Sequence, residues 1–113
     1  MTLQEILKQE QEAKAFAQWI IANSSRVINE EINQSKKSPT ITELLTNKPL
    51  FFLLEAIKVL DQKWWISWHI FDDLINQIKT DYQKLDPQVQ KLFQLKLKNF
   101  RIKQALDLAE ELN

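Results

Sequence analysis

The sequence contains no glycine in 113 residues, and this absence limits the folds and sites open to the chain. Glycine supplies the positive φ angles of the favoured hairpin turns, so a β-rich fold is disfavoured. Walker-type and dinucleotide-binding loops also need glycine, because their backbone must approach a phosphate closely. The chain has no cysteine either, which excludes disulfide scaffolds, thiolate metal sites and cysteine nucleophiles.

Hydrophobic periodicity predicts an aromatic helix over residues 64–82. Its apolar residues recur every three or four positions, which places them on one stripe: Trp64, Trp68, Phe71, Ile75, Ile78 and Tyr82. In the N-terminal half of this segment, apolar residues also cover the flanks of the stripe. Because a helix that is apolar nearly all round is normally buried, we expect this half to form the centre of the domain.

Capping and proline signals predict the remaining helices. Two Thr-x-x-Glu sequences, Thr2–Glu5 and Thr40–Glu43, match the capping-box spacing at a helix start. Pro49 predicts the start of a helix that continues to Leu60, and Asp86–Pro87 predicts the start of a last helix that continues to the chain end. The polar residues after Ala22 leave open whether the N-terminal segment forms one long helix or two.

The length and the links between segments predict a single domain, residues 1–113, that is an all-α bundle of about five helices. The polar segment 34–39, with sequence QSKKSP, is expected to be a flexible link, because proline disfavours helical geometry in the residue before it. The longest apolar run, Leu50–Leu54, is far too short to span a bilayer, and the first twelve residues do not resemble a signal peptide. We therefore expect a cytoplasmic protein.

Catalytic and metal-binding patterns are sparse in this sequence. The single histidine, His69, shares a helix side with Asp73, but two potential ligands do not define a metal site. The preferred interpretation is a histidine in the central aromatic region that is hydrogen-bonded to a nearby carboxylate. We expect no enzyme activity, no metal and no cofactor.

Charge is balanced over the whole chain, with 15 basic and 15 acidic residues, but it is locally segregated. Residues 84–103 contain six basic residues and one acidic residue. On a helix, Lys91, Gln94, Lys98 and Arg101 form a polar stripe about 15 Å long, which predicts contacts to a nucleic-acid backbone. Lys84, Lys36, Lys37 and Arg26 are further candidates for such contacts. A lysine-rich face that simply faces solvent is the alternative interpretation.

Aromatic residues raise a second hypothesis, a helical adaptor that binds protein and no nucleic acid. Trp65 points away from the aromatic stripe and is predicted to anchor a partner surface, together with an apolar patch around Phe51 and Phe52. Aromatic residues at helical spacing are more often part of a core. Binding that survives high salt would distinguish this adaptor from a phosphate-binding surface.

A short, glycine-free, helical chain that ends in a basic helix resembles the small subunit of CRISPR effector complexes of the Cascade kind. The resemblance covers the size and helix pattern of most of the chain and includes no specific motif. It implies a non-catalytic role in antiviral defence, in a ribonucleoprotein complex with other subunits and further copies of the chain. Such a subunit would contact guide RNA, target DNA or the displaced strand, while base pairing supplies the specificity.

Overall fold

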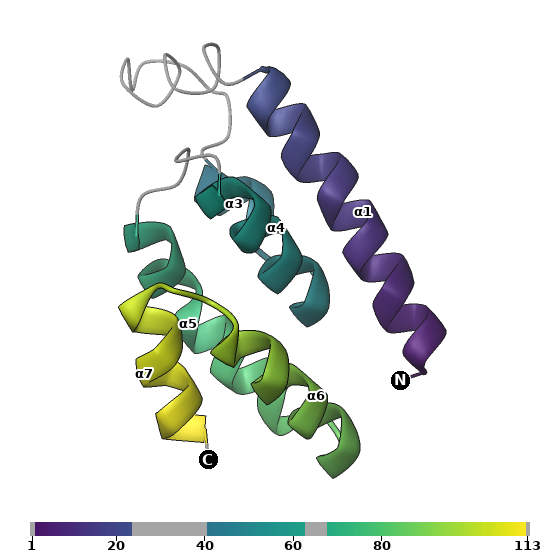
Figure 1. The fold of residues 1–113 in the computed structure, drawn as a ribbon, viewed down its shortest axis with the longest axis vertical. Coiled ribbons are helices and arrows are strands. Elements are labelled where there is room, and N and C mark those ends of the chain that lie inside the picture. Colours follow the sequence, from purple (N-terminus) through teal and green to yellow (C-terminus); the bar gives the residue numbers. More distant parts are fainter. Residues whose placement is uncertain (1, 24–40, 63–67, 113) are drawn as a thin grey trace.

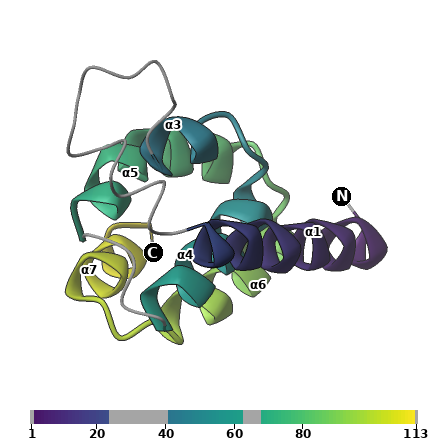
Figure 2. The ribbon, with the colours of Figure 1, turned by 90° about the horizontal axis from the view of Figure 1, so that it is seen from above.

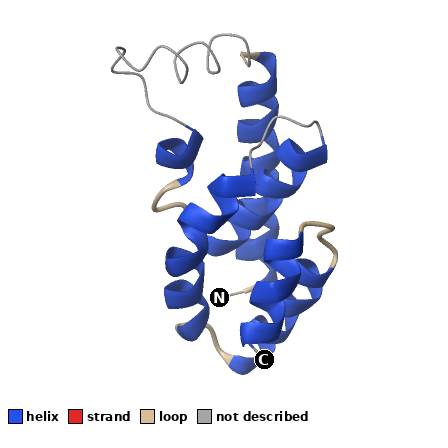
Figure 3. Ribbon diagram, turned by 90° about the vertical axis from the view of Figure 1, so that its left-hand side faces the viewer, coloured by secondary structure: helices blue, strands red, loops and turns tan. Residues whose placement is uncertain are grey.

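The computed structural model describes residues 2–23, 41–62 and 68–112, and all regular secondary structure in these ranges is α-helical (Figure 1, Figure 3). For Ile41 and residues 68–70 the description covers the backbone alone. Within these ranges the structure has six helices: α1 (Leu3–Ala22), α3 (Ile41–Leu45), α4 (Leu50–Gln62), α5 (Trp68–Gln83), α6 (Pro87–Lys98) and α7 (Lys103–Leu112). The predicted all-α fold class is confirmed.

The first helix begins where its capping sequence predicts. The Thr2 hydroxyl oxygen accepts a hydrogen bond from the backbone N–H of Glu5 at 3.2 Å, which satisfies one of the unpaired N–H groups of the first turn. At the other end, the Asn23 side chain donates to the carbonyl of Trp19 at 2.8 Å, and α1 ends at Ala22. The predicted continuation of this segment and the predicted link at 34–39 lie outside the described residues.

Helix α4 occupies the middle of the bundle, with α1 on one side and α5, α6 and α7 on the other (Figure 1, Figure 2). Every residue from Leu50 to Ile57 is buried, so nearly the whole circumference of its first two turns is covered. Helix α1 packs along it through one face, whose buried residues are Ile6, Ala13, Ala17 and Ile20. Among the described elements, α4 therefore contributes most to the core.

The predicted apolar surface patch around Phe51 and Phe52 is wrong. These side chains are 0% and 6% exposed, and both pack inside the bundle. The Phe51 ring meets the Phe93 ring of α6 edge-on at 6.0 Å, and the Phe52 ring lies 5.4 Å from Phe16 of α1. The patch prediction failed because α4 has helices on both sides, which leaves neither ring a solvent-facing flank.

Helices α5 and α6 form an antiparallel pair joined by a short turn. Near the turn, Tyr82 packs on Phe93 with ring centroids 5.3 Å apart, and at the far end Phe71 meets Phe100 edge-on at 6.2 Å. Of the predicted stripe, Phe71, Ile78 and Tyr82 are buried and Ile75 is partly buried. Leu74, which the predicted stripe did not include, is buried as well. Residues 63–67, including Trp64, lie outside the described chain.

The predicted single last helix is wrong, because the structure divides it into α6 and α7. Helix α6 ends at Lys98, and the backbone N–H groups of Asn99 and Phe100 close the end with bonds to the carbonyls of Lys96 and Leu97 at 3.2 Å. Phe100 and Ile102 are both buried and anchor the connection. Helix α7 then folds back along α5, where Lys79 pairs with Glu111 at 2.7 Å.

The resulting bundle is elongated, with principal extents of 43 × 27 × 23 Å. Its radius of gyration of 14.2 Å is near the value of about 13 Å expected for one domain of this length. In the described ranges, none of the helices combines the length and apolar character that a bilayer crossing requires.

Candidate nucleic-acid interface

Helix α6 carries the predicted basic residues, and its start is fixed by its own sequence. The Asp86 carboxylate accepts a hydrogen bond from the backbone N–H of Val89 at 3.0 Å, and Pro87 occupies the first helical position. Val89, Phe93 and Leu97 then bury one face against the core. The opposite face points to solvent and carries Lys91 and Lys98, seven residues apart, which corresponds to about 10 Å along the axis.

Five of the six basic residues in 84–103 are exposed, and we call them the basic segment: Lys84, Lys91, Lys98, Arg101 and Lys103. Within the described part of the chain, none of the five makes an ion pair. The sixth, Lys96, is half-buried and pairs with Glu10 of α1 at 2.8 Å. Among the described residues, the basic segment therefore has no acidic partners that a phosphate would have to displace.

Gln94 does not belong to this surface, so its predicted role is wrong. Its side chain is buried, at 8% exposure, and its amide nitrogen lies 3.5 Å from the Tyr82 hydroxyl. The spacing of Lys91 and Gln94 suggested one polar stripe, but the buried face of α6 extends round the helix as far as Gln94. The pairing of α5 with α6 covers this flank.

The basic stripe on the helix is also shorter than the predicted 15 Å, because α6 ends at Lys98. Arg101 is exposed as predicted, but it lies in the connection between α6 and α7, beyond the helix end at Lys98. The continuous helical part of the surface therefore consists of Lys91 and Lys98. Lys84 precedes α6, and Lys103 opens α7, so cations flank the helix at both ends.

Leu95 is a surface residue that the sequence pattern did not single out. It is 64% exposed and lies between Lys91 and Lys98 on the outer face of α6. The sequence does indicate an exposed leucine here, because Leu95 falls on the opposite side of the helix from Phe93 and Leu97. The outer face of α6 is thus basic with an apolar residue in its middle.

Four residues predicted to bind a partner or nucleic acid lie outside the described chain: Arg26, Lys36, Lys37 and Trp65. The side chain of His69 is also outside the description. Among the described residues, no group of three or more histidine, aspartate and glutamate side chains is arranged to hold a metal ion.

The chain matches no protein-family model, no curated protein and no solved structure. The function of this chain is therefore inferred from its own residues and their geometry.

Proposed function

We propose that this protein is a non-catalytic helical subunit of a nucleoprotein complex, whose basic segment contacts the sugar-phosphate backbone of RNA or DNA. The observation that supports it is the set of five exposed cations without ion pairs among the described residues, in a chain of zero net charge. Cations that bind phosphates release condensed counterions, which drives sequence-independent association. The outer face of α6 suits such backbone contacts better than base reading.

The kind of complex is proposed from the resemblance to small CRISPR effector subunits. It makes a guide RNA–target DNA duplex, or the displaced DNA strand, the expected ligand, with other protein subunits alongside. Purification of the untagged chain from its native cell tests this directly. Co-purifying RNA and large protein subunits would support the proposal, and a single protein partner without nucleic acid would oppose it.

Charge reversal tests the basic segment itself. The triple variant Lys91→Glu, Lys98→Glu and Arg101→Glu replaces three of the five exposed cations by anions. We expect its affinity for a 20-nucleotide duplex or single strand to fall at least about tenfold at low salt, because phosphate contacts are replaced by repulsion. Fluorescence anisotropy measures the binding, and circular dichroism should show an unchanged helical signal, since all three residues are exposed.

A single-site comparison controls for net charge. Lys8→Glu changes the charge of the protein as much as Lys91→Glu does, but Lys8 is an exposed residue of α1 and is not part of the basic segment. The proposal requires Lys91→Glu to weaken binding clearly more than Lys8→Glu. Equal effects would mean that only total charge matters and that the basic segment is not the binding surface.

The protein-only adaptor is the second candidate, and the exposure of Leu95 favours it. A partner that covers the outer face of α6 would remove the apolar surface of Leu95 from water, which favours binding. An adaptor of this kind would keep its partner at high salt and lose it on Leu95→Ser. Nucleic-acid binding should instead survive Leu95→Ser and fail at high salt.

A further inference from the structure

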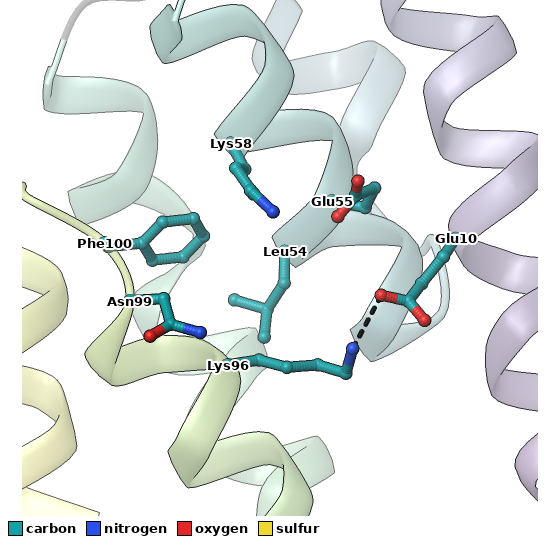
Figure 4. Close-up of a pocket in the computed structure, with 7 residues that line it drawn as sticks. All are labelled: Glu10, Leu54, Glu55, Lys58, Lys96, Asn99 and Phe100. Carbon is teal, nitrogen blue, oxygen red and sulfur yellow. Dashed lines mark hydrogen bonds and ion pairs between the residues drawn. The ribbon is translucent and has the colours of Figure 1, made fainter.

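A pocket of about 80 Å³ lies between α1, α4 and the C-terminal end of α6, away from the outer face of α6 (Figure 4). Leu54 and Phe100 give it an apolar part, and Asn99 adds a side-chain amide. One side is closed by Lys96 and Glu10, which satisfy each other through their 2.8 Å ion pair. The remaining charged side chains of the lining are Glu55 and Lys58, and the inference depends on these two.

The Glu55 carboxylate is largely buried, and few interactions with described residues offset its negative charge. Its side chain is 10% exposed, and among the described residues its one ion pair is to Lys14, at 3.8 Å. Lys14 reaches it from the surface, with a side chain that is 58% exposed. No hydrogen bond from a described residue reaches the Glu55 carboxylate. The Glu55 oxygens are not among the fully buried polar atoms without a partner in the described chain, so they meet solvent at the pocket and can accept hydrogen bonds from a ligand there.

Lys58 presents the complementary group. It lies one turn after Glu55 on α4, and Figure 4 shows its ammonium group directed into the pocket toward the Glu55 carboxylate. The two groups do not form an ion pair, and Lys58 has no other ion pair within the described ranges. An acceptor and a donor of opposite charge therefore face each other across an open space.

The charges of the lining determine which ligand fits this space. Glu10 and Glu55 balance Lys58 and Lys96, so the lining favours neither a simple anion nor a simple cation. A ligand with an ammonium group for Glu55 and a carboxylate for Lys58 would satisfy both groups at once. The amide of Asn99 can donate a further hydrogen bond to the ligand carboxylate.

The size of the pocket limits the ligand. One water needs about 10–15 Å³ of cavity volume, so the pocket has room for a molecule of roughly five to eight non-hydrogen atoms. Leu54 and Phe100 can cover a small apolar substituent. We infer that this pocket binds a small zwitterion, a free α-amino acid of the size of glycine or alanine, independently of the proposed nucleic-acid contact.

Titration followed by two-dimensional NMR tests the inference on the full chain. Glycine and L-alanine are added as zwitterions, with acetate as the matched anion and methylammonium as the matched cation. We expect the zwitterions to shift the backbone amides of Lys58, Asn99 and Phe100, with a Kd of about 1 mM or weaker for so small a ligand. Acetate and methylammonium should shift them much less.

Two variants locate the ligand groups. Glu55→Gln and Lys58→Met each remove one charge, and each should weaken glycine binding at least about fivefold, because one end of the zwitterion loses its partner. Lys8→Met on the exposed side of α1 is the control and should leave binding unchanged. The unliganded NMR spectrum of each variant shows whether it is folded.

Three results would overturn the inference. The zwitterions could leave all three amides unshifted, or acetate or methylammonium could shift them as strongly as glycine does. Alternatively, folded Glu55→Gln and Lys58→Met could both bind glycine as the parent does. Since no nucleic acid is present in this experiment, its failure is distinguishable from failure of the proposed function.

Discussion

At the scale of single residues, Asn47 occupies a turn position with a positive φ angle, which glycine adopts most easily and for which this chain has no glycine. It has a φ angle of 66°, the one positive value among the described residues, in the turn between α3 and α4. Gln77 of α5 holds this turn, accepting from the Asn47 N–H at 3.2 Å and donating to the Lys48 carbonyl at 3.3 Å. Asparagine tolerates the left-handed region better than other residues with a side chain, apart from aspartate.

This conformation leads to a stability prediction. Asn47→Val should lower the free energy of unfolding by about 1–2 kcal/mol, because a β-branched side chain is strained at positive φ. Asn47→Gly should change it by no more than about 0.5 kcal/mol, since glycine adopts this conformation freely. Urea denaturation monitored by circular dichroism measures both variants. A valine variant as stable as the parent would contradict the observed turn geometry.

Helical spacing predicted which residues face the core more reliably than it predicted the edges of each face. Phe71, Ile78 and Tyr82 are buried as their spacing indicates. The spacing of Gln94 from Lys91 and Lys98 predicts a place on the polar stripe, although α5 covers the flank where Gln94 lies. The number of helices that pack around a given helix depends on the tertiary structure. The residue pattern along that one helix does not reveal this number.

At the scale of elements, the division between α6 and α7 shows how tertiary contacts determine a helix end. Neither glycine nor proline stands between Lys98 and Lys103 to mark it. The apolar face lies on the Phe93 side in α6 and on the Ala105 and Leu108 side in α7. Burial of Phe100 and Ile102 in the connection accounts for this difference by turning the chain back toward α5.

The start of α6 was predictable, because its cap is local in sequence, and it can be tested as an element. Asp86→Ala removes the acceptor of the Val89 N–H bond and should cost about 1 kcal/mol of folding free energy. Asp107→Ala, at an exposed position inside α7, is the matched control and should change stability by about 0.5 kcal/mol or less. Thermal and urea unfolding of the two variants give the comparison. Equal losses would show that the cap contributes nothing specific.

At the scale of the whole molecule, balanced charge conceals an uneven distribution. The excess of basic residues lies in 84–103, whereas α5 carries Asp72, Asp73 and Asp81 against one lysine, and α7 carries three acidic residues after Lys103. A polyanion would therefore meet attraction near α6 and repulsion near α5 and α7. The sequence predicted this segregation, but only the structure distinguishes the exposed cations from Lys96, which Glu10 neutralises.

The salt dependence of nucleic-acid binding tests the central claim most directly. If all five cations of the basic segment contact duplex phosphates, the slope of log K against log salt concentration should be about −4.5. In the triple variant Lys91→Glu, Lys98→Glu and Arg101→Glu, the slope should become shallower by about 2.7, the share of three contacts. A parental slope near zero, or a triple variant with the parental slope, would contradict the assignment of a backbone-binding surface to the basic segment.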